Sequence, residues 1–252
     1  MADNIKISAA IVTYNSGDKS AAAVASVLAY CRQYPLDLYI IDNNSSDDTL
    51  LRLKEHPDIK IIKLKKNVGF GAAHNKVSEL LNSDYHFIIN PDITVHSDVF
   101  ADIVNFMEEN PKVVMAAPKI LNADGSEQRL PKATPTFKRL FLGRLSKKVR
   151  DEYTRADIET DKPYPVDFLS GCFFCIRTEA FRSLGGFDER YFMYLEDADL
   201  TARAKTIGEA VFLPQVSVTH LWARESAKNV KLFFIHLISC FKFLIKWRHG
   251  AK

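Results

Sequence analysis

The stretch that decides the fold is "HFIINPDITV", residues 86–95. Its first half, His86-Phe87-Ile88-Ile89, has the aromatic and β-branched side chains of a buried strand. The chain leaves this strand through Asn90-Pro91-Asp92, where the proline fixes its own φ and restricts Asn90. The pattern predicts a strand that ends by presenting one rigidly aimed carboxylate, Asp92. An ordinary turn explains the same residues, so both interpretations stay open.

Apolar runs that end in polar turns recur on both sides of this stretch. The further predicted strands are "IKISAAIVTYN", "LDLYIIDNNSSDDT", "IKIIKLKKN", "VVMAAPKI", the start of "VDFLSGCFFCIRTEAF" and "AVFLPQVSVTHLW". The predicted helices cover 18–33, 49–55 and 72–82, "VHSDVFADIVNFMEENP" with Ser97 as cap, and a segment opened by Glu196 and closed by Gly208. This alternation predicts an α/β fold with a doubly wound, mostly parallel central sheet and helices on both faces. Sites in such sheets lie outside the carboxyl ends of the strands.

Composition restricts the classes of function. The 252 residues are 47% hydrophobic, which is enough to bury a core. The net charge of +3 argues against a nucleic-acid binder, and the N-terminus lacks the pattern of a signal peptide, so a cytoplasmic location is expected. We expect one domain over 1–226, with halves 1–125 and 126–226, followed by a C-terminal helix within 227–252.

The cysteines indicate no disulfide framework or metal site. Four are present, at positions 31, 172, 175 and 240. Cys172 and Cys175 have the CxxC spacing, but no second pair follows, and in a strand they point to opposite faces. We therefore expect buried structural thiols.

Carboxylates at strand ends are the candidate ligand groups. Asp42 ends the second strand, where an acidic residue commonly holds a ribose, although an Asx turn explains it equally. After the first strand, 13–17 lacks the G-x-G-x-x-G of dinucleotide enzymes, which disfavours that cofactor. Asp92, beside a nucleotide pocket, is suited to a divalent cation that in turn binds a diphosphate.

The sequence Glu196-Asp197-Ala198-Asp199 opens a predicted helix. Acidic residues in a first turn complement the helix dipole, but three carboxylates in four residues exceed what a cap needs. One of them is suited to act as a general base toward a hydroxyl. His220 follows a strand whose start is expected near the same edge, where its imidazole would suit Mn²⁺, although a lone histidine is more often structural.

Taken together, these turns resemble the inverting family 2 glycosyltransferases of the GT-A fold, most closely their bacterial rhamnosyltransferase-like branch. The matching segments occur in the family's order over about residues 5–226: "IVTYNS", "IIDNNSSDDT", "KNVGFGAAHN", "IINPDITV", "APKILNADGS", "VDFLSGCFFCIRTEAF", "GGFDERYFMYLEDADLTARA" and "VSVTHLWARES". The resemblance implies a GT-A domain that binds a nucleotide-diphosphate sugar and a divalent metal, Mn²⁺ or Mg²⁺.

The resemblance also implies roles for residues. The nucleotide would contact Thr13, Tyr14, Asn15, Asp42, Asn67, Gly69, Phe70, Asn75, Asn90 and Asp92. The metal ligands would be Asp92 and His220. Asn90 stands where members of the family commonly have a second Asp, and it adds no negative charge. The metal would therefore depend on His220 and on the donor's phosphates as further ligands. Gly171, Cys172 and Glu196 would line the acceptor cleft, and Arg224 and Ser226 would reach the diphosphate.

The implied reaction is a single displacement with inversion. Asp197 would deprotonate an acceptor hydroxyl, and the N-terminus of its helix would help keep it ionised. The branch suggests dTDP-L-rhamnose as donor and cell-surface polysaccharide synthesis as the pathway. A UDP- or GDP-linked sugar, a sugar nucleotidyltransferase and an inactive membrane-surface relative are the alternatives.

Two segments without acidic residues suggest an anionic surface nearby. They are 128–150, with eight basic residues, and 226–252, with six. In "VKLFFIHLISCFKFLIKW", 230–247, Lys231, Lys242 and Lys246 form a narrow stripe opposite an apolar face that contains Cys240 and Phe243. The segment is too interrupted to span a membrane, so we expect an amphipathic helix peripheral to the inner face of the cell membrane. The alternative is docking on the core or on the second subunit of a homodimer. Both basic segments fit a saccharide acceptor carried on a lipid diphosphate.

Overall fold

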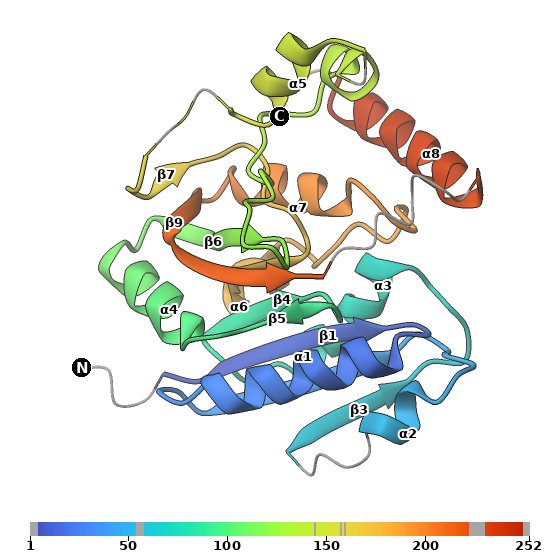
Figure 1. Cartoon of the computed structure of the whole chain (residues 1–252), viewed down its shortest axis with the longest axis vertical. Helices are drawn as coiled ribbons and strands as arrows, with labels where there is room; N and C mark the ends of the chain where they lie inside the picture. The colour runs from blue at the N-terminus through green and yellow to red at the C-terminus, as the bar shows by residue number, and fades with distance from the viewer. Residues whose placement is uncertain are drawn as a thin grey trace.

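The computed structural model describes residues 5–53, 58–143, 145–156, 158, 160–221 and 230–248. Its described strands form one nine-stranded sheet in the order β3-β2-β1-β4-β8-β6-β9-β5, with β7 beside β9 (Figure 1). The strands are β1 (Ile7–Thr13), β2 (Leu36–Asp42), β3 (Ile59–Lys63), β4 (Tyr85–Ile89), β5 (Ile93–Thr94), β6 (Val113–Leu121), β7 (Tyr164–Pro165), β8 (Phe173–Arg177) and β9 (Glu209–His220).

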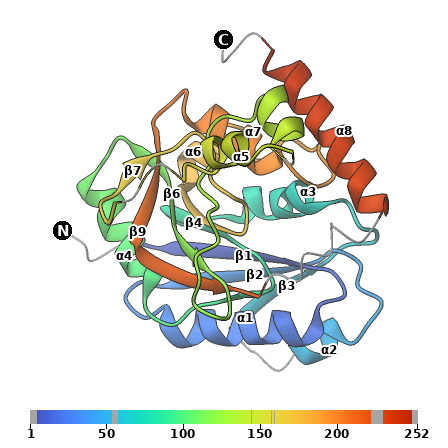
Figure 2. The ribbon, with the colours of Figure 1, turned by 45° about the horizontal axis from the view of Figure 1, so that its top comes forward.

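Helices cover both faces of the sheet, as predicted (Figure 2). They are α1 (Gly17–Tyr30), α2 (Thr49–Leu53), α3 (Phe70–His74), the 3₁₀-helix η1 (Asn75–Leu80), α4 (Val99–Glu109), the π-turn η2 (Lys138–Leu142), α5 (Lys147–Tyr153), α6 (Thr178–Ser183), α7 (Glu196–Ala204) and α8 (Val230–Lys246). One apolar core lies under α1 and α4, and a second under α3, α6 and α7. Alternate strand residues serve opposite cores, since Phe87 and Ile89 face the first and Ile88 the second.

The strand directions decide which residues meet at one edge. β3, β2, β1 and β4 run parallel, so Thr13 and Asp42 end together and Asn90 follows β4 at the same edge. β8 runs antiparallel to both β4 and β6, a feature not predicted from the sequence. Its amino end, preceded by Gly171 and Cys172, therefore lies at the carboxyl edge of β4. Because β6 and β9 are parallel, the end of β9 also reaches this edge.

Two local predictions are wrong in detail. The cap of α4 is Asp98 and not Ser97: Asp98 Oδ1 accepts from the Ala101 N–H at 3.0 Å, while its other oxygen accepts from the backbone after α1. The helix predicted over 72–82 begins earlier, at Phe70, and changes to a 3₁₀-helix at Asn75, whose side-chain amide bonds the backbone of Phe187.

Candidate active site

Tyr14, Asn15 and Asp42, at the ends of β1 and β2, form one polar surface, called the ledge below. Asp42 is buried, and its Oδ1 accepts from the Ser45 N–H at 3.0 Å. Among the described residues its Oδ2 has no hydrogen-bond partner, which leaves an acceptor for a ligand hydroxyl. Asn15 has φ of 50° and accepts from the Ser46 N–H, so it fixes the loop after β2. Tyr14 is half exposed beside it.

Other predicted residues of this ledge support the backbone. The Thr13 hydroxyl is buried and bonds the hydroxyls of Ser16 and Ser20 at 2.7 Å. Asn67 accepts from the Gly69 N–H and from the side chain of Asn43, a buried residue that the sequence analysis did not single out. The side-chain amide of Asn75 donates to the Phe187 carbonyl and accepts from the Phe187 N–H, both at 2.8 Å.

Gly69 brings two halves of the site together. Its φ is +91°, and a Cβ there would lie 2.1 Å from the carbonyl oxygen of Phe192, so only glycine fits. The next residue, Phe70, donates its N–H to the same carbonyl at 2.9 Å. A Cβ on Gly171 would meet the Phe70 ring at 3.3 Å and Asp197 at 3.2 Å. The predicted nucleotide-side and acceptor-side residues therefore meet at Gly171.

Asp92 and His220 form a close pair. The chain runs from β4 through Asn90-Pro91-Asp92 directly into β5, which pairs antiparallel with the last residues of β9, Ile93 opposite His220. Asp92 Oδ1 lies 3.1 Å from His220 Nε2, and both side chains are mostly buried. The prediction that the start of His220's strand meets this edge is wrong, because β9 meets it with its end. The Asn90 N–H donates to the Cys172 carbonyl at 2.8 Å, which ties the turn to β8.

The pair fits a divalent cation as a partial donor set. A carboxylate oxygen and an imidazole nitrogen are both ligands of Mn²⁺-type ions. Bonds of about 2.1 Å at adjacent octahedral positions place two ligand atoms about 3 Å apart, close to the observed separation. Among the described residues no group of three His, Cys, Asp or Glu side chains could hold a metal ion.

The acidic triplet opens α7 after an unusual backbone. Tyr194 and Leu195, just before Glu196, have φ of 72° and 64°, a left-handed conformation that non-glycine residues rarely adopt. This turn directs Asp197 toward β8, where its Oδ2 accepts from the Gly171 N–H at 2.8 Å and its Oδ1 from the Ala198 N–H at 2.9 Å. Part of Asp197 remains exposed to solvent.

The two neighbouring carboxyls have different surroundings. Burial, and then the charge of Asp197, raises the pKa of Glu196 well above its ordinary value. Burial also raises the pKa of Asp197, opposed by the Gly171 N–H and by Lys132. Since Asp197 accepts two backbone N–H bonds while Glu196 Oε2 has no partner among the described residues, Asp197 is the better holder of the negative charge. The Ala198 N–H, in the first turn of α7, also lowers the pKa of Asp197, which is the direction expected of a helix N-terminus, but burial is the larger effect.

A family comparison decides the class of this site. The model of glycosyl transferase family 2 matches residues 8–185, which is most of the described sheet. The chain belongs to this family.

Curated relatives of this glycosyltransferase include two rhamnosyltransferases. The N-acetylglucosaminyl-diphospho-decaprenol L-rhamnosyltransferase of Mycobacterium tuberculosis is 28% identical over 238 residues, 86% of this chain and 76% of that protein. Rhamnosyltransferase WbbL of Escherichia coli is 27% identical over 176 residues, 66% of this chain and 64% of that protein.

Solved structures confirm the GT-A fold predicted for the glycosyltransferase. GalNAc-T7 with UDP, GalNAc and Mn²⁺ superposes with a TM-score of 0.73 at 17% identity, over 98% of this chain and about half (49%) of that one. The mannosyltransferase PcManGT from Pyrobaculum calidifontis with GDP-Man and Mn²⁺ superposes with a TM-score of 0.69 at 16% identity. The match covers 99% of this chain and 66% of that one.

The remaining predicted site residues are Cys172, which is buried, and Arg224 and Ser226, which lie outside the described residues. Burial raises the pKa of the Cys172 thiol to about 12, and Cys175 is buried too, so the prediction of buried thiols is confirmed for this pair. The Cys172 carbonyl, not its sulfur, makes the contact with Asn90.

Lys132 is a site residue that sequence reasoning missed. Its ammonium lies 4.8 Å from the centre of the Phe168 ring and 5.7 Å from that of Tyr153. Burial lowers its pKa, and the nearby charge of Asp197 opposes that effect. The acid-free run at 128–150 signalled a basic segment, but nothing in it marked this lysine.

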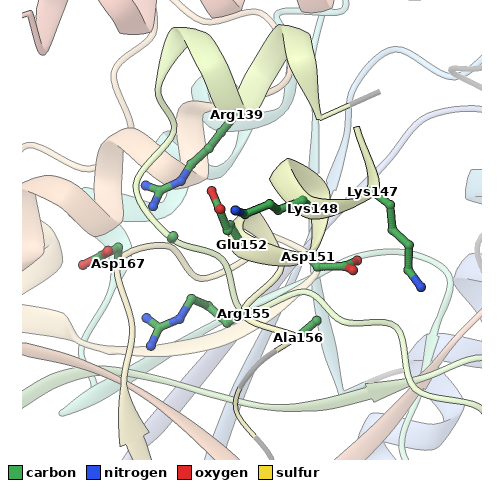
Figure 3. Close-up of a pocket in the computed structure, with 9 residues that line it drawn as sticks. Arg139, Lys147, Lys148, Asp151, Glu152, Arg155, Ala156 and Asp167 are labelled. Atoms are coloured by element: carbon green, nitrogen blue, oxygen red, sulfur yellow. The ribbon is translucent and has the colours of Figure 1, made fainter. Parts of the chain in front are cut away.

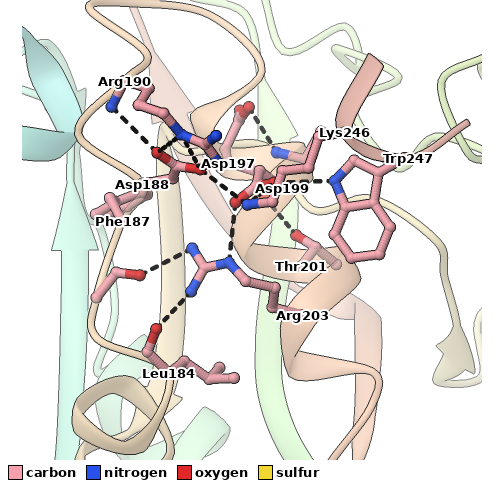
Figure 4. A network of polar contacts seen from close by, with 12 residues as sticks. Leu184, Phe187, Asp188, Arg190, Asp197, Asp199, Thr201, Arg203, Lys246 and Trp247 are labelled. Atoms are coloured by element: carbon pink, nitrogen blue, oxygen red, sulfur yellow. Dashed lines mark hydrogen bonds and ion pairs between the residues drawn. The ribbon is translucent and has the colours of Figure 1, made fainter. Parts of the chain in front are cut away.

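The C-terminal helix is attached to α7 through Asp199 (Figure 4). Asp199 is fully buried, and it pairs with Arg203 at 2.9 Å and Lys246 at 2.6 Å and accepts from Trp247 Nε1 at 2.9 Å. Arg203 also donates to the carbonyls of Leu184 and Gly186. One buried carboxylate thus joins α8, α7 and the loop before it.

We predict that Lys246→Met lowers the free energy of unfolding by about 1–3 kcal/mol, because the buried Asp199 loses a charged partner. Chemical denaturation would measure it. Lys242→Met is the matched control on the same helix, because that ammonium is exposed and donates to the Arg190 carbonyl. Equal losses in the two variants would contradict the assigned role of Lys246.

We predict that Glu196→Gln raises the unfolding free energy at pH 8 and has little effect near pH 4.5. The folded pKa of Glu196 is raised, so its stabilisation is complete below the unfolded pKa and is lost as pH rises toward the folded one. Each unit of that shift corresponds to about 1.4 kcal/mol. Denaturation at several pH values tests this, with the exposed first-turn Glu179→Gln as control. A pH-independent difference would refute it.

Proposed function

We propose that this chain is an inverting glycosyltransferase that moves L-rhamnose from dTDP-L-rhamnose to a hydroxyl of a saccharide carried on a lipid diphosphate, in cell-surface polysaccharide synthesis. The observation that carries the proposal is the joining of two groups through β8. Asp92, which pairs with His220, lies two residues after Asn90, whose N–H donates to the Cys172 carbonyl. The N–H of the adjacent Gly171 donates to Asp197. A diphosphate-binding group and a base thus face one strand end. The names of two relatives support rhamnose.

The donor's nucleoside would lie on the ledge of Tyr14, Asn15 and Asp42, with the free Asp42 Oδ2 accepting from a ribose hydroxyl. Asp92 and His220 would hold Mn²⁺ or Mg²⁺, which supplies charge neutralisation for the departing nucleoside diphosphate. The Phe70 ring and Asp197 both lie beside Gly171, and a sugar would be positioned near them.

Asp197 would take the proton from the acceptor hydroxyl as that oxygen attacks the anomeric carbon. Its two backbone hydrogen bonds fix the carboxylate in one orientation, and the attack comes from the face opposite the leaving group, so configuration inverts. Glu196, kept neutral by burial, would donate a hydrogen bond to the acceptor rather than compete for its proton.

We predict that Asp197→Asn lowers sugar transfer by at least 10²-fold, because the proton acceptor is lost together with one of the two backbone N–H bonds. The variant should still bind the nucleotide, whose proposed contacts lie on other residues. Product formation would be measured with a panel of dTDP-, UDP- and GDP-sugars, and binding by thermal shift with the matching nucleotide and Mn²⁺. Glu179→Gln, at an exposed carboxylate of α6, is the control and should keep the wild-type activity. Near-normal turnover by Asp197→Asn would exclude it as the base, and a preference for UDP- or GDP-sugars would reassign the donor.

We also propose that α8 contacts an anionic membrane surface, with its faces assigned differently from the sequence analysis. Cys240 and Phe243 are buried against the protein, and Lys246 points inward to Asp188 and Asp199, so the predicted apolar membrane face is wrong. The outward face is apolar instead. It is formed by Val230, Phe234, Ile238, Phe241 and Ile245, exposed by 49–71%. No helix among the described residues has the length and apolarity needed to cross a bilayer.

The outward face continues onto the neighbouring η2 segment, which carries cations. Phe141 contacts Phe241 with ring centres 6.0 Å apart, and Leu145 nearby is 86% exposed. Residues of η2 and α5 also line a cavity of about 860 Å³, where Arg139, Lys147 and Lys148 stand together with acidic groups (Figure 3). Apolar side chains flanked by basic ones are typical of a surface that binds anionic lipid.

We predict that the triple substitution Phe234→Gln, Ile238→Gln and Ile245→Gln abolishes flotation with liposomes that contain anionic lipid, because it removes exposed apolar area without touching the buried face. The control carries Leu51→Gln and Ile207→Gln, which are equally exposed elsewhere. Flotation of the triple variant at the wild-type level would refute membrane contact. A wild-type dimer that the triple variant dissociates would assign the face to a second copy.

A further inference from the structure

Gln128 is a buried residue that touches the proposed cation site without lying in it. It follows the turn after β6, and its backbone N–H donates to the Ile120 carbonyl at 2.8 Å. Its amide reaches the end of β9. Nε2 lies 3.0 Å from the His220 carbonyl oxygen and 2.8 Å from Asn122 Oδ1, and Oε1 lies 3.0 Å from His220 Nδ1.

The backbone determines which way this amide points. A carbonyl oxygen only accepts hydrogen bonds, so the amide atom 3.0 Å from the His220 carbonyl must be the NH₂ group. The oxygen of the same amide then faces His220 Nδ1. Since an amide oxygen is only an acceptor, Nδ1 must carry a proton to form that contact.

This proton determines the chemistry of the opposite nitrogen. With Nδ1 protonated, the neutral imidazole has its lone pair on Nε2, the atom that lies 3.1 Å from Asp92 Oδ1. A lone pair and a carboxylate oxygen repel each other unless a positive charge lies between them. That positive charge is either a proton on Nε2 or a cation bound by both atoms, and in the neutral Nδ1–H tautomer both atoms can coordinate a cation.

We propose that Gln128 is a positioning residue: it fixes the ring and the tautomer of His220 so that Nε2, together with Asp92, coordinates the divalent cation. The inference rests on the cation site of the proposed function, and it holds whatever sugar the enzyme transfers. Gln128 acts only through His220, since its amide is directed at Nδ1 and at the backbone. Outer partners of this kind typically change metal affinity by about 10–100-fold.

Three variants separate this role from general support of the fold. Gln128→Met keeps the length of the side chain but loses the acceptor for Nδ1–H. Gln128→Glu keeps that acceptor and loses the donor. Asn122→Ala is the matched control, because it removes a partner of the Gln128 NH₂ group and a bond to Ser126 but leaves the acceptor for Nδ1–H in place. The probe is Mn²⁺ with dTDP, its free concentration followed by electron paramagnetic resonance.

Mn²⁺ binding to Gln128→Met should weaken by about 10–100-fold. Gln128→Glu should recover most of that loss, and Asn122→Ala should stay within about threefold of wild type. In ¹⁵N spectra of the wild type without metal, His220 should be the Nδ1–H tautomer, a readout that requires no variant to fold. The Nε2–H tautomer there, or unchanged Mn²⁺ affinity in folded Gln128→Met, would overturn the inference while leaving the proposed transfer intact.

If the wild type binds no Mn²⁺ with dTDP, UDP or GDP, the cation site and this inference both fail. Product assays with the sugar panel would then still decide the transferase activity separately.

Discussion

The three-residue connection between β4 and β5 is the constraint on which the site depends. Asn90, Pro91 and Asp92 are all that separates these strands in the chain, yet β8, β6 and β9 lie between them in the sheet. The sheet must therefore curl until the edge strand β5 returns to the end of β4. That closure brings the end of β9 beside the turn, and it places His220 against Asp92 although 127 positions lie between them. Pro91 restricts the turn, so the carboxylate has little freedom to leave this position.

Two groups at this edge of the sheet, the Asp92–His220 pair and Asp197, differ in their electrostatic surroundings. The Asp92–His220 pair offers one carboxylate, and the Asn90 side chain adds no charge, so the protein would supply only part of the ligands of the proposed cation. Such a site would favour binding of cation and diphosphate together. Asp197, by contrast, accepts from the N–H groups of Gly171 and Ala198 and lies near the charge of Lys132. These groups favour its ionised form although burial raises its pKa, as the proposed role of base requires.

How much of this was predictable differs from element to element. The strand ends at Asp42 and Asp92 follow from apolar runs that stop at polar residues, which is a local signal. The segments around Asp197 and His220 were recognised from family patterns, and no local rule places either one in space. The reversed direction of β8 has no signature in its own sequence, because a buried strand is apolar whichever way it runs. Gln128 and Lys132 were missed for a related reason, since their partners lie on other elements.

The C-terminal helix shows why a helical projection was insufficient. Both the inner and the outer face of α8 are apolar, and the lysines lie along the boundary, so periodicity alone did not decide which face would be buried. The decision comes from α7: Asp199 is buried, and its charge requires cations, which Arg203 and Lys246 provide. Once Lys246 is drawn inward, the row from Val230 to Ile245 must face outward. The exposed apolar face of α8 is thus linked to an ion pair two residues from the proposed base, so the proposed lipid contact at α8 and the proposed role of Asp197 both depend on the buried charge of Asp199.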